Sequence, residues 1–194
     1  AASRDHPWIP VPDAVSDKYA IDGGQTDLET LAGRLLNEVM PYATGNTHPR
    51  FFGWVHGTGL ASGLLAEMVA VTMNSNLGGR DHGLNRVERA VIDWARGVFG
   101  FPDAASGLLV AGTSQATVIA LAAARLKVMG PDLRRTGTGG RQATVYAGRA
   151  AHNALRKAVE LLGIGSDFLR LVPEGSRGPD VQVLRDLIAR DRAS

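Results

Sequence analysis

The sequence contains no cysteine, which excludes a disulfide framework, a zinc site made of thiolates and a thiol nucleophile. No apolar run approaches the roughly 18 residues that a membrane-spanning helix needs, and no secretory signal pattern is present. An excess of one charge is also missing, because 21 basic residues stand against 19 acidic ones and the basic residues form no stripe. We therefore expect a cytoplasmic protein that binds neither a membrane nor a nucleic acid.

Lysine is scarce as well, and the only lysines are Lys18, Lys127 and Lys157. Of the 194 residues, 44% are hydrophobic and 21% are charged, which is the composition of a globular protein with a sizeable core. The chain begins with alanine, and its last stretch has the pattern of a helix that simply stops. We expect it to be a segment of a longer protein.

The first 100 residues are predicted to be mostly helical, after an extended arm rich in proline and glycine at residues 1–26. Thr26 and Glu29 have the spacing of a capping box at the start of a helix, and Pro41 is predicted to end that helix. An aromatic, turn-rich loop follows at 42–59. Two more helices are predicted at 60–73 and 87–99, separated by a polar loop, and the second has an apolar stripe of Val87, Val91, Trp94 and Val98.

From residue 101 onward, short apolar runs alternate with helical patterns. Strands are predicted at 107–111, 142–147 and 168–172, and helices at 114–129, 151–162 and 181–188. This alternation predicts an α/β layer with a mostly parallel sheet.

The segment Leu109–Ala116 has the strongest local signal for chemistry, because an expected strand runs through Gly112 and two hydroxyl residues into a helix. The free N–H groups and the dipole of a helix start, together with the hydroxyls of Thr113 and Ser114, make a site for a phosphate or a carboxylate. Two other interpretations stay open. Thr113 or Ser114 caps its own helix, or Ser114 is the nucleophile of a hydrolase with Asp132 and His152.

His152 follows the second predicted strand and begins the next helix. Ligands of open α/β sheets bind at the carboxyl ends of the strands, so His152 and the 112–114 turn are expected to line one pocket. The imidazole there can stack on a flat ring, act as an acid or base, or bind a metal. The alternative is that His152 only caps its helix.

Other candidate sites are weaker. His48, His56 and His82 lie in separate loops without the spacing of a metal site, so no metal is expected. The glycine-rich stretch 137–140 lacks the Lys-Ser/Thr of a phosphate-binding P-loop. The aromatic cluster at 51–54 is predicted to pack in a core or an interface, with a pocket role left open.

Several segments, in this order, resemble the group II amino acid decarboxylases that depend on pyridoxal phosphate, which include glutamate and aromatic amino acid decarboxylases. The resemblance covers nearly the whole chain. The matching segments are His48–Gly53, Val87–Glu88 with Trp94, Phe101–Pro102, Gly107–Ala116, Ala120–Arg125, Val145–Tyr146 and His152–Gly163.

The resemblance implies a helical amino-terminal segment followed by part of a fold-type-I large domain, with the division near residue 100. It implies that Gly112, Thr113 and Ser114 hold the cofactor phosphate. His152 would stack on the pyridine ring and assist protonation after carbon dioxide leaves the external aldimine. The substrate pocket would contain Trp54, Val55 and Asn76, the last in a loop that reaches the partner subunit's site. Ala111 and Gln115 depart from the family pattern.

The resemblance also implies a homodimer with shared active sites, acting on an amino acid that the sequence does not identify. Arg50 and Arg80 are candidate partners for a substrate carboxylate by loop position only. No lysine is placed to form the Schiff base, so the segment alone is expected to be inactive. Two alternatives remain: a truncated, non-catalytic relative that dimerises with a homologue, and another anion-binding α/β enzyme such as a serine hydrolase.

Overall fold

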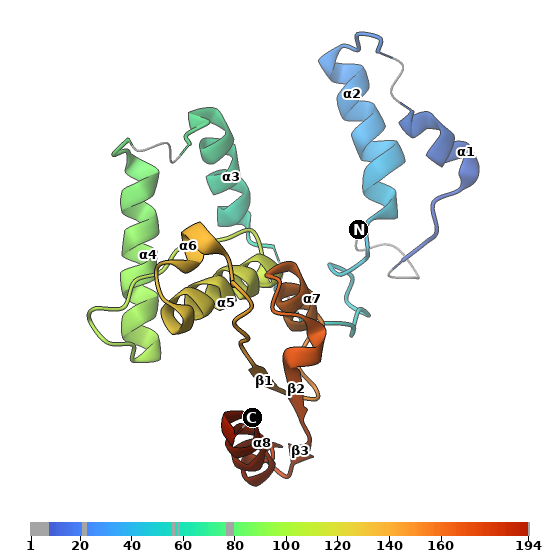
Figure 1. Cartoon of the computed structure of the whole chain (residues 1–194). Helices are drawn as coiled ribbons and strands as arrows, with labels where there is room; N and C mark the ends of the chain where they lie inside the picture. The colour runs from blue at the N-terminus through green and yellow to red at the C-terminus, as the bar shows by residue number, and fades with distance from the viewer. Residues whose placement is uncertain (1–7, 21–22, 56, 58, 77–79, 194) are drawn as a thin grey trace. The chain divides into compact units, whose positions relative to one another are not determined.

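The computed structural model describes residues 8–20, 23–55, 57, 59–76 and 80–193 (Figure 1). The chain divides into two compact units, residues 1–80 (unit 1) and 81–194 (unit 2). The boundary predicted from the sequence, near residue 100, falls at the end of a helix of unit 2. That division by function stays a prediction.

Unit 1 is helical. Its elements are α1 (Asp13–Ser16), the 3-10 turn η1 (Asp17–Tyr19), α2 (Leu28–Arg34), its π-helical continuation η2 (Leu35–Val39), the 3-10 turn η3 (Met40–Tyr42) and α3 (Ala61–Met73).

The start of α2 differs from the prediction by one residue. Asp27, not Thr26, is the N-cap, because Asp27 Oδ1 accepts the N–H of Thr30 at 2.8 Å. The helix predicted to end at Pro41 is present as α2 and η2, and Pro41 lies in the 3-10 turn η3 that follows. The helix predicted at 60–73 is confirmed.

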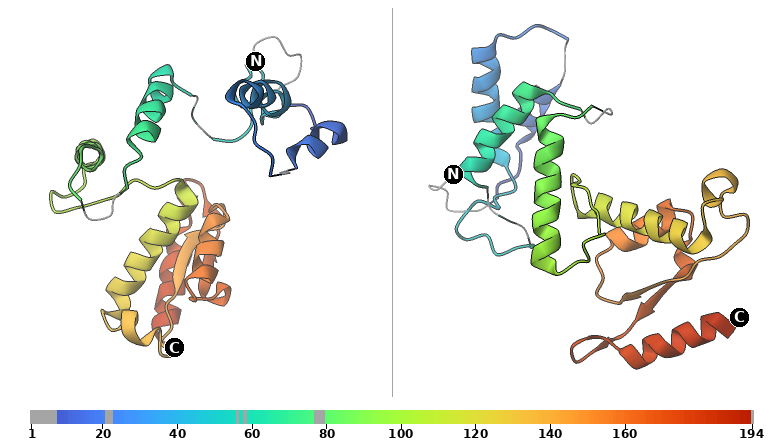
Figure 2. Two further views of the ribbon diagram at one scale, coloured as in Figure 1. Left: turned by 90° about the horizontal axis from the view of Figure 1, so that it is seen from above. Right: turned by 90° about the vertical axis from the view of Figure 1, so that its left-hand side faces the viewer.

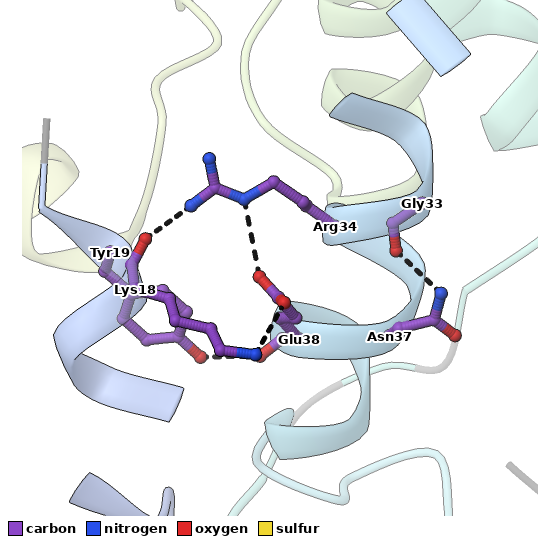
Figure 3. A network of polar contacts seen from close by, with 6 residues as sticks. All are labelled: Lys18, Tyr19, Gly33, Arg34, Asn37 and Glu38. Atoms are coloured by element: carbon purple, nitrogen blue, oxygen red, sulfur yellow. Dashed lines mark hydrogen bonds and ion pairs between the residues drawn. The ribbon is translucent and has the colours of Figure 1, made fainter. Parts of the chain in front are cut away.

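The arm before α2 was predicted to be extended, but part of it is helical. Side chains hold the 3-10 turn η1 against the helix (Figure 3). The hydroxyl of Tyr19 donates to the carbonyl oxygen of Glu38 at 2.6 Å. The carboxylate of Glu38 pairs with Lys18 Nζ at 3.1 Å and with Arg34 Nε at 3.4 Å. The hydrogen bond from Lys18, above all, holds the pKa of Glu38 below its usual value.

Among its described residues, unit 2 contains four α-helices of eight or more residues, one α-helix of four residues, a 3-10 turn, two parallel strands and a small hairpin. They are α4 (Gly83–Phe99), α5 (Thr113–Met129), α6 (Leu133–Thr136), β1 (Val145–Gly148), α7 (Ala154–Leu161), η4 (Ser166–Phe168), β2 (Leu169–Val172), β3 (Glu174–Gly175), β4 (Gly178–Pro179) and α8 (Val181–Ala193).

The sheet confirms the predicted α/β class. β1 and β2 pair in parallel, with Val145 opposite Leu169 and Gly148 opposite Val172. β3 and β4 form a short antiparallel hairpin. α7 makes the crossover between the two parallel strands and α5 packs beside it (Figure 2).

The core of unit 2 lies between α5, α7 and the parallel strands. Val159, Ile164 and Leu169 form its buried centre, and Val159 is fully buried. The face predicted for the 151–162 helix is confirmed, since Ala158 and Val159 are buried. Partly buried side chains complete the cluster: Leu121, Val145, Ala147, Leu155, Leu162 and Phe168.

Two predictions about packing are wrong for this chain. Residues 107–111 do not form a strand, because a strand needs a neighbour to accept its N–H groups and none of the described segments pairs with this one. The apolar stripe of α4 is exposed, with Trp94 at 68% and Val98 at 59%. The half-buried face of α4 contains Glu88, Ile92 and Arg96 instead.

Candidate functional site

The start of α5 is built around Gly112, which is the N-cap of the helix. The first helical hydrogen bond runs from the N–H of Ala116 to the carbonyl oxygen of Gly112 at 3.1 Å. The N–H groups of Thr113, Ser114 and Gln115 have no acceptor among the described residues, as expected for the first turn of a helix. These three N–H groups form what we call the cradle.

The cradle is open. A Cβ atom built on Gly112 would meet no atom within 4 Å. The hydroxyls of Thr113 and Ser114 make no hydrogen bond within the described part of the chain. The interpretation that either residue caps its own helix is therefore wrong, because the N-cap is a glycine and no side chain bonds there.

The side chain of Gln115 folds back over the turn, which sequence reasoning did not predict. Its Oε1 accepts the N–H of Ala111 at 3.2 Å. A signal was present, because a Gln or Glu at the third helical position commonly reaches back to a backbone N–H before the helix. The N–H that it occupies precedes the cradle, so the cradle itself is not filled by this side chain.

The loop before α7 is held firmly at the carboxyl end of β1. The N–H of Arg149 donates to the carbonyl oxygen of Val172 at 2.9 Å, and that of Ala150 donates to Glu174 Oε1 at 3.0 Å. Gly148 allows this approach, since a Cβ there would lie 2.8 Å from both Glu174 Oε1 and Pro179 Cγ.

His152 is exposed and contributes a cap to α7. Its Nδ1 accepts the N–H of Ala154 at 3.1 Å, so His152 contributes to capping the helix, while the interpretation that it only caps the helix stays a prediction. An Nδ1 that accepts a hydrogen bond leaves the proton of a neutral imidazole on Nε2. His152 also lines a small cavity of about 170 Å³ with Arg149, Asn153 and Leu171. Capping thus fixes the ring and leaves Nε2 available.

The cradle and the loop of His152 lie at the same end of unit 2. Arg125, late in α5, donates to the carbonyl oxygen of Leu162 at the end of α7, so the two helices run in the same direction side by side. Both therefore begin near the carboxyl end of β1, as Figure 2 shows on the right. This is the end where ligands of open α/β sheets bind.

Lys127 lies far from the cradle along its own helix. Lys127 is 14 residues beyond Thr113, about 21 Å along α5 at the usual helical rise. Lys18 belongs to unit 1 and pairs with Glu38 at 3.1 Å. Lys157 lies on an exposed part of α7.

The hydrolase interpretation is wrong on geometry. Ser114 is at the start of the 17-residue helix α5, and Asp132 follows its end. The helix separates them by about 25 Å. Asp132 instead pairs with Arg135 at 3.6 Å.

The predicted substrate-pocket residues belong to unit 1. Trp54 is 72% exposed and has a left-handed backbone, with φ of 59°, and its ring meets Phe51 edge-on at 5.3 Å. Val55 and Asn76 are exposed. Residues 77–79 of the loop predicted to reach the partner lie outside the described residues. The pocket role of Trp54, Val55 and Asn76 stays a prediction.

No group of three or more potential metal ligands occurs among the residues that the structure describes. His48 Nδ1 accepts the N–H of Arg50 at 3.1 Å, His82 is the N-cap residue of α4, and His56 lies outside the described residues. Over the same described ranges, no helix has the length and apolarity to cross a membrane. The cytoplasmic location stays a prediction.

Known proteins resemble this chain over most of its length. It is 28% identical over 172 residues to an aromatic-L-amino-acid decarboxylase from Bacillus atrophaeus, which covers 86% of this chain and 34% of that protein. It is 25% identical over 183 residues to the enzyme of the same name from Cavia porcellus, covering 86% of this chain and 37% of that protein. The chain thus spans about a third of the length of these relatives.

Solved structures share the fold. The glutamate decarboxylase domain of a diaminobutyrate-pyruvate transaminase and L-2,4-diaminobutyrate decarboxylase from Vibrio parahaemolyticus superposes with a TM-score of 0.82 at 20% identity, covering 94% of this chain and 42% of that one. The Oryza sativa TDC with PLP and tryptamine gives 0.77 at 22% identity, with the same coverage of 94% and 42%.

The family predicted from the sequence is confirmed by a match to a family model. The model described as "Pyridoxal-dependent decarboxylase conserved domain" matches residues 15–194, which is nearly the whole chain. The relatives and the fold of the solved structures agree with this match. The chain belongs to the pyridoxal-dependent decarboxylase family.

Proposed function

We propose that this chain is the amino-terminal part of a pyridoxal-phosphate-dependent amino acid decarboxylase and that it binds the cofactor phosphate and one face of the cofactor ring. The observation that carries the proposal is the open cradle at the start of α5, at the same end of unit 2 as His152. When bound, pyridoxal phosphate supplies an electron sink for the electron pair left when the α-carboxylate departs as carbon dioxide.

The residues of the cradle fit a phosphate group. Three N–H groups without acceptors in the described chain, two free hydroxyls and the positive end of a 17-residue helix converge on one open space. Gly112 has no side chain that could occupy this space. We assign Gly112, Thr113 and Ser114 to binding the phosphate.

His152 fits a flat ring beside that phosphate. The hydrogen bond from Ala154 fixes the imidazole, and its free Nε2–H can donate to a neighbouring acceptor. We propose that His152 stacks on the cofactor ring and holds the proton that is returned to the substrate carbon. The imidazole of His152 needs this fixed orientation, because a rotating imidazole would lose both the stacking contact and the position of its proton.

Trp54, Val55 and Asn76 are proposed to line the substrate pocket. The left-handed backbone of Trp54 supports this role, since a bulky residue adopts that conformation at a cost of roughly 1–3 kcal/mol and such strain is concentrated at functional sites. The substrate class is an amino acid, whose side chain these residues do not identify.

The covalent anchor is proposed to lie outside this chain. Lys18, Lys127 and Lys157 are all placed away from the cradle or on exposed positions of helices. The chain spans about a third of its relatives, so the Schiff-base lysine and the acid that pairs with the ring nitrogen are assigned to the remainder of the protein.

A homodimer is proposed on the basis of α3. This helix carries a single charged residue, Glu67, and its apolar side chains are exposed, with Leu64 at 68% and Met68 at 62%. A helix that is apolar on all sides is normally buried. We propose that the first 100 residues dimerise, and that residues 101–194 begin the cofactor-binding domain.

The test is an absorbance scan of the full protein with pyridoxal phosphate, followed by borohydride reduction and peptide mapping. We expect a visible band, a pyridoxyl group on a lysine outside residues 1–194, and release of carbon dioxide from an amino acid. The absence of a band in the full protein would remove the enzyme assignment. A band that needs co-expression with a homologue would favour the non-catalytic partner instead.

A further inference from the structure

Within the described chain, two side chains hold the backbone that leads into the cradle. Residues 107–111 were expected to be a strand, but the described chain pairs them with no other strand. Two of their N–H groups, those of Leu109 and Ala111, are nevertheless occupied. The acceptors are Glu88 Oε1 at 2.7 Å and Gln115 Oε1 at 3.2 Å.

The first acceptor belongs to a row of contacts along α4. Glu88 and Ile92 are one turn apart, so they lie on the same face of the helix. Glu88 bonds to Leu109, while a Cβ on Gly107 would come within 3.2 Å of the Ile92 side chain.

One turn further on, Arg96 Nη1 donates to the carbonyl oxygen of Asp103 at 2.9 Å. The three contacts therefore follow one face of α4, from Glu88 through Ile92 to Arg96. The segment that they touch runs in the opposite direction along the helix, from Leu109 back to Asp103. This row fixes the segment against α4, three residues before Gly112.

The second acceptor closes the turn from its other side. Gln115 is the third residue of α5 and one of the three residues whose N–H groups form the cradle. Its side chain reaches back to Ala111, which directly precedes Gly112. As a neutral amide, it holds the backbone without placing a negative charge next to a bound phosphate.

We infer that Glu88 and Gln115 are positioning residues for the cofactor phosphate, through Leu109 and Ala111. This inference rests on the proposed function. The two side chains hold the backbone before the cradle and set the direction in which Gly112 enters α5. The cradle binds an anion well only when its N–H groups converge, and a displacement of the turn would spoil that convergence.

The test compares Gln115→Leu and Glu88→Leu with wild type in the full protein. The main readout is the ratio of the affinity for pyridoxal phosphate to the affinity for pyridoxal, which isolates the phosphate contribution from general stability. We expect this ratio to fall about tenfold in each variant, because the turn loses one hydrogen bond that orients the donors. Glu88→Gln keeps an acceptor oxygen and should restore the ratio.

Gln182→Leu is the matched control, since it makes the same change at an exposed position of α8 and should leave the ratio unchanged. Hydrogen exchange of the Ala111 amide gives a second readout and should accelerate in Gln115→Leu but not in Gln182→Leu. A wild-type ratio in both leucine variants would overturn the inference, even if they melt earlier.

The experiment distinguishes a wrong positioning role from a wrong proposed function. If wild type binds pyridoxal phosphate and the leucine variants bind it equally well, the positioning role is wrong and the proposed function stands. If wild type does not bind the cofactor, the proposed function is wrong. In that case, unchanged exchange at Ala111 in Gln115→Leu would also overturn the positioning role of Gln115.

Discussion

At the scale of single residues, the site depends on groups that are left without partners. Thr113 and Thr117 carry the same hydroxyl one turn apart on α5, but only Thr117 is engaged, donating to the carbonyl oxygen of Thr113 at 2.8 Å. The free hydroxyl of Thr113 stands at the cradle. This contrast fits the proposal that Thr113 binds the phosphate and that Thr117 does not.

Thr113→Val should weaken binding of pyridoxal phosphate by about 10-fold or more, because a hydrogen bond to a charged group contributes about 1.5–3 kcal/mol. Its melting temperature should stay near that of wild type, since the hydroxyl makes no bond within the described chain. Thr117→Val is the control and should leave the affinity unchanged. Equal affinities for wild type and Thr113→Val, measured by fluorescence titration, would exclude the hydroxyl from the phosphate site.

At the scale of elements, the loop after β1 depends on a glycine. A Cβ on Gly148 would lie 2.8 Å from Pro179 Cγ, a ring atom that cannot rotate away. Gly148→Ala should therefore destabilise the protein by about 1–3 kcal/mol, as overpacking does, and lower the melting temperature. Gly97→Ala, inside α4 with no atom within 4 Å, should instead stabilise by about 0.5–1 kcal/mol. A Gly148→Ala protein that melts like wild type would contradict the packing of this loop.

The attachment of α8 should depend on pH. Arg170 donates to Asp191 through Nη2 at 3.0 Å, and Tyr146 donates to it at 2.7 Å. The hydrogen bond from Arg170, followed by that from Tyr146, holds the pKa of Asp191 below its usual value of 3.8. Stability from this group is fully present above that usual value and is lost as the pH falls through the lowered pKa of the folded state.

Asp191→Asn should melt below wild type at neutral pH, and the two melting curves should converge at strongly acidic pH. Tyr146→Phe removes one hydrogen bond and should cost about 1 kcal/mol at neutral pH. A difference between wild type and Asp191→Asn that persists unchanged into strong acid would show that the carboxylate does not carry this pH dependence.

Helices were predictable from the sequence to within a few residues, because their apolar period is local. The 114–129 prediction matches α5 at Thr113–Met129, and 60–73 matches α3 at Ala61–Met73. The cradle at Gly112 was predictable for the same reason, since a glycine and two hydroxyls before a helical run form a local pattern.

Features that depend on distant partners were not predictable. The prediction of a strand at 107–111 was wrong for this chain, because an apolar run does not reveal whether a neighbouring strand is present. The exposure of the apolar stripe of α4 was not predictable either. An apolar face indicates that the helix packs against something, but it does not identify the partner. The bonds of Glu88 to Leu109 and of Tyr146 to Asp191 join residues 21 and 45 positions apart, beyond any local pattern.

At the scale of the whole molecule, each unit exposes large apolar side chains. In unit 1 these include Leu64 at 68% and Met68 at 62%, and in unit 2 Trp94 at 68% and Val98 at 59%. The buried hydrophobic residues that the described ranges contain all lie in unit 2, between Leu133 and Val172. The exposed apolar side chains fit the proposal that further protein surface, including a second copy, covers them.

Met68→Asp, on the exposed apolar α3, should weaken the proposed dimer, because burying an unpaired carboxylate in an interface is costly. Sedimentation of the full protein should show a dimer for wild type and a shift toward monomer for the variant. Gln182→Asp adds the same charge on α8 and serves as the control. A monomeric wild type, or a Met68→Asp protein that stays dimeric, would contradict the role given to α3.

The most direct test of the cofactor site is the affinity of Gly112→Asp for pyridoxal phosphate. An aspartate at the N-cap would accept the N–H groups of the first turn and place a negative charge in the open space. We predict that the helix melts no earlier than in wild type, while binding of pyridoxal phosphate weakens at least about tenfold and binding of pyridoxal changes little. Gly112→Asp that binds pyridoxal phosphate as tightly as wild type would contradict phosphate binding at the start of α5.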